Sequence, residues 1–295
     1  MSTSIPVCVW PVNAELGEGP LWQAAENAVY FVDIKGCHIH RLSVATGQTQ
    51  TWKAPAQPGF VVPLADHHAF VCGLPDGLHR FDARSGQFSK LKEVEAHLPG
   101  NRLNDGFVDA SGHLWFGSMD DGEEQPNGTL YRVSDEGEVV PQDDGYVITN
   151  GPALSPDART LYHGDTLRRV VYAFDVSEDG TLSRKRTFAA ISGDGYPDGM
   201  AVDADGFVWI ALFGGWRIER YSPDGKRVEQ VPFPCANVTK LAFGGDDLRT
   251  VYVSTAWKGL SSAERQQQPL AGGLFSFRSP THGQHQARCT RGFSQ

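Results

Sequence analysis

The sequence predicts an all-β fold, a six-bladed β-propeller with a central metal-containing channel, in one domain that spans residues 1–295. Three observations favour this fold. The 33 glycines and 18 prolines divide the chain into short segments. These segments are rich in Val, Phe, Tyr, Trp and Leu, and they alternate between apolar and polar residues as strands joined by tight turns do. A unit of roughly 40 to 48 residues with about four such segments recurs six times, as propeller blades do.

Each repeat is expected to open with a short strand, continue with further strands and end in a turn. The expected strands are 21–22, 28–33, 38–42 and 49–52; 59–62, 68–73 and 77–81; 106–108, 113–118 and 128–133; 160–163 and 169–175 after Asn150; 207–212 and 216–221 after Asp198; and 250–255 and 273–277 after Asn237.

Three segments lie outside this repeat. Residues 5–10 are apolar, and we expect them to pair with the last blade and close the ring, which would protect a sheet edge. A helical turn is expected at 261–266, within a late insertion. After Phe277 the chain is polar, and we expect a frayed tail.

Composition limits the partners and locations that we expect. No apolar run approaches the roughly 18 residues needed to cross a bilayer, so no membrane association is expected. The net charge is −9 and no basic stripe is present, which argues against a nucleic-acid partner. Met1-Ser2-Thr3-Ser4-Ile5 lacks the features of a secretory signal, so we expect a cytoplasmic protein. The five cysteines lack C-x-x-C spacing, and we expect free, buried thiols.

Four repeats open with the same kind of stretch, in which an oxygen-bearing side chain is followed by glycine and an apolar run. The stretches are Leu16-Gly17-Glu18-Gly19-Pro20, Leu103-Asn104-Asp105-Gly106, Thr149-Asn150-Gly151-Pro152 and Pro197-Asp198-Gly199. Taken singly, each acid or amide is explained as a turn former before glycine. If the repeats are arranged around an axis, however, residues at the same position in each repeat lie at the same distance from that axis. We therefore expect these side chains to meet. The second repeat lacks such a residue.

Glu18, Asn150 and Asp198 together offer two carboxylates and an amide oxygen. These are hard ligands, and they predict a site for one divalent metal ion. Ca²⁺ is the first expectation, and Mg²⁺, Mn²⁺, Zn²⁺ and Fe²⁺ remain open. Because three protein ligands leave coordination positions for water and substrate, the set also suits catalysis.

The sequence resembles the senescence marker protein-30/gluconolactonase/regucalcin family, and in particular its bacterial sugar (aldono) lactonases. The resemblance covers nearly the whole chain. Its motifs, in order, are Gly17-Glu18-Gly19-Pro20 with Phe31-Val32-Asp33-Ile34, Asn101-Arg102-Leu103-Asn104-Asp105-Gly106, Ile148-Thr149-Asn150-Gly151, Tyr196-Pro197-Asp198-Gly199 and Asn237-Val238-Thr239-Lys240. The resemblance implies a six-bladed propeller with a single divalent metal in its channel.

The resemblance also implies roles for individual residues. Glu18, Asn150 and Asp198 match the family's metal ligands, and Asp198 also matches its candidate acid/base. Arg102 and Asn104 match residues that contact the sugar. A further substrate-contacting carboxylate is expected after Gly117-Ser118-Met119, and either Glu123 or Asp121 fits that position.

The function that follows is hydrolysis of an aldono-1,4- or 1,5-lactone to the aldonic acid. Water is the nucleophile, and either Asp198 or the metal itself promotes loss of its proton. Two alternatives stay open: a phosphotriesterase-like esterase on the same fold, and a non-enzymatic calcium-binding or scaffold propeller. The expected partner is a small sugar lactone, and the expected assembly is a monomer or a weak homo-oligomer. Which lactone and which metal are native stays open.

Other polar and aromatic residues carry weaker signals. His38 and His40 lack the spacing of known zinc motifs, and we expect a structural or surface role for them. His163 ends an inner segment and is expected to line the channel if it has a function. Trp216 follows two glycines and offers a surface for stacking on a sugar ring. Asp203-Ala204-Asp205-Gly206 is expected to be a turn, since the later acidic ligand of a calcium loop is missing.

Overall fold

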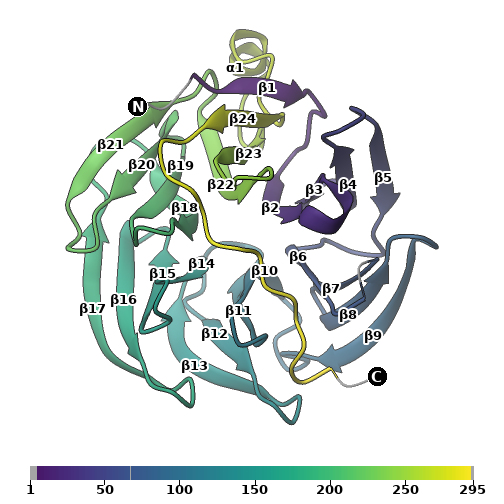
Figure 1. Ribbon diagram of the computed structural model, residues 1–295, viewed down its shortest axis with the longest axis vertical. Helices are drawn as coiled ribbons and strands as arrows, with labels where there is room; N and C mark the ends of the chain where they lie inside the picture. The colour runs from purple at the N-terminus through teal and green to yellow at the C-terminus, as the bar shows by residue number, and fades with distance from the viewer. Residues whose placement is uncertain (1–4, 67, 294–295) are drawn as a thin grey trace.

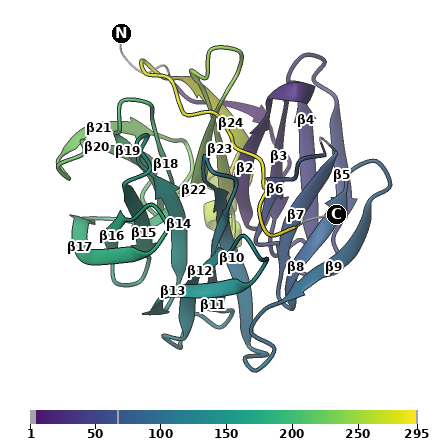
Figure 2. The same cartoon turned by 60° about the horizontal axis from the view of Figure 1, so that its bottom comes forward.

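The computed structural model describes residues 5–66 and 68–293, so residues 1–4, used above to search for a signal, are outside the described part. The strands form six four-stranded sheets arranged around a central axis (Figures 1 and 2). Neighbouring strands within a sheet run antiparallel. The prediction of a six-bladed β-propeller is confirmed.

The first five blades each use four consecutive strands, ordered outward from the axis. Blades 1 to 3 comprise β2 (Gly17–Gln23), β3 (Ala28–Asp33), β4 (His38–Ser43) and β5 (Thr49–Lys53); β6 (Phe60–Pro63), β7 (Ala69–Leu74), β8 (Gly77–Asp82) and β9 (Gln87–Glu93); and β10 (Asn101–Val108), β11 (Leu114–Asp120), β12 (Gly128–Val133) and β13 (Val139–Tyr146). Blades 4 and 5 comprise β14 (Thr149–Leu154), β15 (Thr160–Asp165), β16 (Val170–Val176) and β17 (Leu182–Ala190); and β18 (Tyr196–Val202), β19 (Val208–Phe213), β20 (Arg217–Tyr221) and β21 (Arg227–Pro232).

Blade 6 joins the two ends of the strand sequence. Its strands, from the axis outward, are β22 (Asn237–Gly244), β23 (Thr250–Ala256), β24 (Leu274–Arg278) and β1 (Val7–Trp10). Val7 pairs with Ser276 and Cys8 with Phe275. The N-terminal strand therefore closes the ring, as its apolar sequence predicts.

The short helical elements are η1 (Ala24–Glu26) in blade 1 and α1 (Ser262–Gln267) in blade 6. The Ser261 hydroxyl accepts a hydrogen bond from the Glu264 amide, and the Glu264 side chain accepts one from the Ser261 amide, which makes a capping box. The helical turn expected in this insertion is confirmed.

The hydrophobic core lies between neighbouring blades. Tyr30 of blade 1 packs against Phe70 of blade 2 with ring centroids 4.6 Å apart, and Phe70 in turn contacts Phe81. Trp209 of blade 5 packs against Phe243 of blade 6 in the same way. Because apolar faces bind blade to blade, the inner strands are held in a closed ring around the axis.

The inner strands of five blades change register against the second strand close to their polar residues. The shifts fall between Glu18 and Leu21, Leu103 and Gly106, Asn150 and Ala153, Pro197 and Met200, and Val238 and Lys240. A bulge of this kind re-aims side chains at the point where it occurs. In blade 2, β6 pairs with β7 without a shift. This is the blade whose opening sequence lacks a polar residue.

The segment that follows β24 crosses one end of the ring (Figure 1), and the expectation of a frayed tail is wrong. Its polar groups form hydrogen bonds with all six blades. The Gly283 amide donates to Leu248 O, the His282 carbonyl accepts from Ala204 N, and the Gln284 amide donates to Leu154 O. Further along, Cys289 N donates to Pro63 O, Thr290 N to Gly112 O, and Arg288 to the Gln23 side chain. We call residues 279–293 the C-terminal strap.

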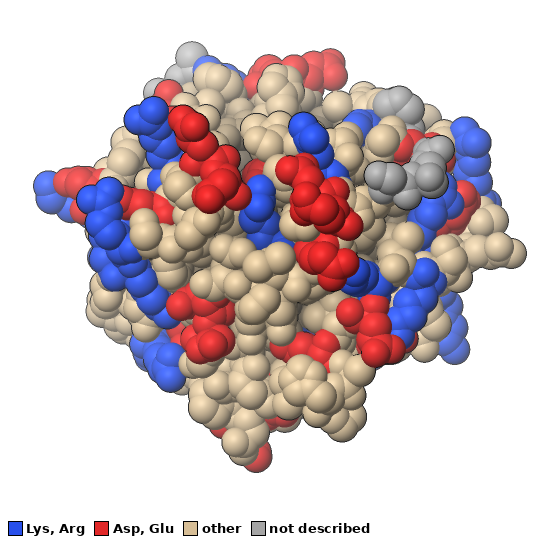
Figure 3. Space-filling view, turned by 90° about the horizontal axis from the view of Figure 1, so that it is seen from below, with Lys and Arg blue, Asp and Glu red and all other residues tan. Residues whose placement is uncertain are grey.

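Further features of the described chain concern its cysteines, its helices and its surface charge. All five cysteines are described and free, but only Cys72, Cys235 and Cys289 are buried; Cys8 and Cys37 are partly exposed, so the expectation of buried thiols is wrong for these two. No helix among the described residues is long and apolar enough to cross a membrane. Acidic and basic side chains are interspersed on the side of the ring displayed in Figure 3. The 203–206 stretch forms a turn, in which the Asp203 carboxylate accepts hydrogen bonds from Asp205 N and Phe207 N.

Candidate active site

The polar residues at the starts of the inner strands line a common cavity of about 240 Å³. The residues expected from the sequence that line it are Glu18 on β2, Arg102 and Asn104 on β10, Asn150 on β14, Asp198 on β18, and Glu123 in the loop after β11. Asp121 is not among the described residues that line it. No described residue of blade 2 lines it either, which matches the regular pairing of β6.

The recurring sequence of an acid followed by glycine has a local structural cause. The amide of Gly19 donates to Glu18 Oε2 at 2.8 Å, and the amide of Gly106 donates to Asp105 Oδ1 at 2.8 Å. The Asp198 carboxylate accepts a hydrogen bond from the Gly199 amide in the same manner. Gly19 has φ +56, a conformation that residues with a side chain rarely adopt. At these three bulges the glycine amide thus turns back onto the preceding carboxylate and fixes it.

Burial strongly favours the protonated forms of the two carboxylates in the cavity. Glu18 is 7% exposed and Asp198 is 6% exposed. Burial first, and then the nearby Asp105 carboxylate, raises the pKa of Glu18 to about 8. Burial and the adjacent Glu18 carboxylate also raise the pKa of Asp198 well above its ordinary value. The Glu18 and Asp198 carboxylates are adjacent and buried, so they need a shared proton or a cation between them.

A divalent cation fits this donor set. Asn150 donates from Nδ2 to Thr166 Oγ1 at 2.7 Å, which directs its oxygen toward Asn104 and the cavity. The site therefore presents one amide oxygen and two carboxylates, which are the oxygen ligands that hard divalent ions prefer. A cation here would relieve the repulsion between Glu18 and Asp198.

Arg102 is buried and held in place from both sides. Its Nε donates to Asp121 Oδ1 at 2.7 Å, and its Nη1 donates to Asn104 Oδ1 at 2.6 Å. Asp121 is also bonded to Lys35 at 2.7 Å. Asn104 then donates from Nδ2 to Thr149 O at 2.6 Å. Asp121 consequently acts behind Arg102, as an anchor, and Arg102 orients the Asn104 amide.

Glu123 makes an ion pair with Lys258 across the mouth of the cavity. Glu123 comes from the loop after β11 in blade 3, and Lys258 follows β23 in blade 6. The Lys258 backbone is fixed in turn, because its amide donates to Glu15 O at 2.8 Å and its carbonyl accepts from Asn237 Nδ2 at 3.0 Å. Two insertions far apart in the chain thus meet at the entrance.

Sequence reasoning missed several residues of the site. Lys240 forms a buried ion pair with Asp105, which sits beside Glu18 and partly compensates its negative surroundings. Lys240 belongs to the stretch Asn237-Val238-Thr239-Lys240 that opens the sixth repeat, so its position within the repeat could have indicated it as a site residue. Lys240 does not itself line the cavity; the missed residues that do are Leu16, Ile148, Thr166, Leu167, Tyr196, Phe213 and Lys258. Most of these lie on turns or strand ends that the repeat pattern does not distinguish.

Two expectations about the channel are wrong. His163 is fully buried within blade 4, where its ring packs edge-on against Tyr146 at 4.8 Å and does not reach the cavity. Burial, with a further contribution from Lys185, lowers the pKa of His163 to about 3, so its ring is neutral at pH 7. Trp216 is 44% exposed on the turn before β20 and does not line the cavity. Tyr196 and Phe213 supply the aromatic surface there.

The fold is thus a six-bladed propeller in which carboxylate and amide oxygens are gathered in one cavity of the channel. The chain belongs to the SMP-30/gluconolactonase/LRE-like family, whose model matches residues 16–257. The resemblance noted from the motifs is confirmed.

Relatives and solved structures agree with this assignment. The chain is 35% identical over 274 residues to 6-deoxy-6-sulfogluconolactonase of Pseudomonas putida, covering 92% of this chain and 94% of that protein. It is 36% identical over 280 residues to L-arabinolactonase of Azospirillum brasilense, covering 92% and 91%. The structure resembles the calcium-binding protein regucalcin of Agrobacterium tumefaciens with a TM-score of 0.93 and 26% identity, covering 99% and 98%.

Proposed function

We propose that the chain is a sugar lactonase that uses one divalent metal ion, held by Glu18, Asn150 and Asp198. The observation that carries the proposal is the meeting of two buried carboxylates and an oriented amide oxygen beside Arg102 and Asn104. The similarity to relatives named as lactonases supports the same reaction. Ca²⁺ is the first expectation for the ion because all three ligands are hard oxygens.

The reaction opens a cyclic ester with water. When bound, a divalent cation polarises the lactone carbonyl and stabilises the negative charge that develops on its oxygen. Asp198 is assigned as the base that takes a proton from the attacking water. As the bond between the carbonyl carbon and the ring oxygen breaks, that proton passes to the ring oxygen, which becomes a hydroxyl group of the aldonic acid.

The remaining residues of the cavity suit a polyhydroxylated ring. Arg102 and Asn104 provide hydrogen-bonding groups on one side, and Glu123 and Lys258 provide them at the mouth. Tyr196 and Phe213 offer apolar surface for the C–H faces of the sugar. Asp121 contributes by holding Arg102 in place.

A second candidate function is calcium binding without catalysis. It is favoured by the hard oxygen donors and by the similarity to a regucalcin described as a calcium-binding protein. The two functions differ in outcome when a lactone is present, because only the enzyme accelerates ring opening.

A metal-depletion experiment distinguishes them. The protein is stripped with a chelator and reconstituted with Ca²⁺, Mg²⁺, Mn²⁺, Zn²⁺ or Fe²⁺, and acid release is followed on a panel of aldonolactones. We expect loss of activity after stripping and recovery with at least one cation. Hydrolysis no faster than the spontaneous rate with every cation would overturn the proposal, and retained calcium binding in that case would support the second candidate.

A further inference from the structure

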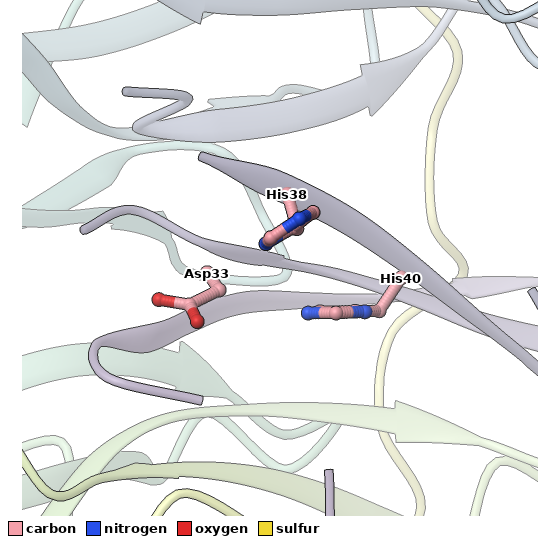
Figure 4. Close-up of side chains that lie close together, drawn as sticks. All are labelled: Asp33, His38 and His40. Atoms are coloured by element: carbon pink, nitrogen blue, oxygen red, sulfur yellow. The ribbon is translucent and has the colours of Figure 1, made fainter. Parts of the chain in front are cut away.

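Asp33, His38 and His40 form a second cluster of possible metal ligands, separate from the channel cavity. One potential ligand atom from each of these residues lies within 4.8 Å of the others. Figure 4 shows the His40 ring pointing toward the Asp33 carboxylate, with His38 above them. None of the three residues lines the channel cavity.

Strand register brings these residues together. β3 and β4 are antiparallel neighbours in blade 1, and Asp33 is directly opposite His38. His40 is two residues further along β4, so it faces the same side of the sheet as His38. Cross-strand and diagonal neighbours on one face are close enough to share a ligand.

His40 carries an unsatisfied nitrogen that is aimed into the cluster. Its side chain is buried, with the residue 5% exposed, and no described residue forms a hydrogen bond with Nε2. Nδ1 is 2.9 Å from Thr51 Oγ1. A buried polar atom without a partner is costly, and native structures rarely keep one without a reason.

The surroundings of His40 fit a ligand role. The ring packs against Trp10 at 5.4 Å and Phe31 at 4.9 Å, which fixes its orientation. Metal-binding histidines usually use their second nitrogen in a hydrogen bond, and Thr51 provides that partner.

Asp33 is equally well oriented. Its Oδ1 accepts hydrogen bonds from the amides of Leu16 and Gly36, and its Oδ2 accepts one from Glu15, each at 3.0 Å. A side chain at position 36 would approach Asp33 Oδ2 to within 2.3 Å, so glycine is needed there. A carboxylate has about four acceptor positions, which leaves room on Oδ2 for one more partner.

We propose that Asp33, His38 and His40 bind a divalent transition-metal ion, with Zn²⁺ the first choice, in blade 1. Two imidazoles and one carboxylate suit Zn²⁺ or Cu²⁺, whereas Ca²⁺ prefers oxygen ligands alone. Three atoms at most 4.8 Å apart lie no more than about 2.8 Å from a common centre. Side-chain shifts of about 1 Å would bring them to the 2.0–2.2 Å distances of zinc ligands, with water as a fourth ligand.

The test is metal binding in a background that lacks the channel ligands. The Glu18→Gln/Asp198→Asn double variant is stripped of metal and titrated with Zn²⁺ and, separately, with Ca²⁺ in a calorimeter. We expect one equivalent of Zn²⁺ and no Ca²⁺ to bind. Because the readout is binding in a variant without channel ligands, its result does not depend on the proposed lactonase activity.

Substitutions in this background locate the ion. His38 is partly exposed, so His38→Ala is expected to keep the fold and weaken Zn²⁺ binding at least about 10-fold. The matched control is His79→Ala, which removes a strand histidine of blade 2 that lies beside Asp76, at the register that corresponds to His40, and should leave Zn²⁺ affinity unchanged. Electron paramagnetic resonance of bound Cu²⁺ should show coupling to two imidazole nitrogens.

Two results would overturn the proposal. One is the absence of Zn²⁺ binding in the double variant while its fold is intact by circular dichroism. The other is Zn²⁺ binding that survives His38→Ala unchanged, since the ion would then be held by other residues.

Discussion

The two ends of the central channel are built from the same six strands and have opposite character. At one end the inner strands are bulged and present Glu18, Asn150 and Asp198 to a polar cavity. At the other end they pair regularly, and a smaller space of about 90 Å³ is lined mainly by apolar side chains, among them Leu21, Val62, Phe107 and Phe243, together with Lys240. Residues 284–286 of the C-terminal strap cover it.

This difference shows that the bulges, and not the ring itself, create the site. The repeats give the channel its closed wall, and the irregular step in the pairing aims oxygen atoms into it. Blade 2 supports this interpretation, because its regular inner strand contributes no described residue to the cavity. We therefore expect the polar end to control activity and the covered end to control stability.

The largest expected effect is on activity at the polar end. Asp198→Asn removes a proposed ligand and the proposed base, so kcat/KM for lactone hydrolysis should fall at least about 1,000-fold. Burial already favours the protonated carboxyl group of Asp198, so the amide should leave the melting temperature nearly unchanged. Asp157→Asn, on an exposed turn after β14, is the matched control and should retain full activity. Near-normal hydrolysis by Asp198→Asn would contradict both of its roles.

Removal of the C-terminal strap tests the covered end. A chain that stops at Arg278 loses hydrogen bonds to all six blades and exposes the apolar lining. We expect the melting temperature to fall by at least about 5 °C. Gln284→Ala, which removes only the bonds to Leu154 O and Val202 O, should cause a smaller fall. An unchanged melting temperature in the truncated chain would show that the strap does not stabilise the ring.

Arg102→Ala tests whether substrate binding at the polar end depends on this residue. It removes a buried cation that orients Asn104, so KM should rise about 10- to 100-fold with a smaller change in kcat. Lys35→Ala removes the other cation on Asp121 without touching the cavity and should have little effect on KM. Equal effects of the two substitutions would argue against a substrate-binding role for Arg102.

The pH dependence of the metal-free protein is the smallest effect. Because the pKa of Glu18 rises from 4.5 to about 8 on folding, its contribution to stability is complete below about pH 4.5 and is lost as the pH rises through 8. The melting temperature of stripped protein should therefore fall between pH 5 and 8.5, and less so in Glu18→Gln. Added divalent cation should restore it most strongly at the high end. A flat profile in stripped wild-type protein would contradict the buried carboxylate pair.

Much of the fold could be predicted because its signals are local. The apolar, β-branched and aromatic run at 28–33 predicts β3, and the apolar stretch at 5–10 predicts the strand that closes blade 6. The strap could not be predicted in this way. Its polar sequence resembles a loose tail, and it is held by backbone carbonyl and amide groups of the turns, which every sequence carries.

The residues of the site are likewise divided into those that the sequence predicts and those that it does not. The phase of the repeat predicted that Glu18, Asn150 and Asp198 would be neighbours, and all three line the cavity. Lys258 could not be found, because the path of an insertion decides which residue it meets. The spacing of His38 and His40 matches no zinc motif and therefore predicts only a structural or surface role, and only the pairing of β3 with β4 reveals that Asp33 lies near them.

The most direct test of the account is the position of a metal ion in the channel. Crystals of the protein soaked in Mn²⁺ should give an anomalous scattering peak within about 2.6 Å of oxygen atoms from Glu18, Asn150 and Asp198. A saturating soak that leaves these three side chains without a shared peak, or a peak that touches none of them, would contradict the proposed metal-dependent lactonase.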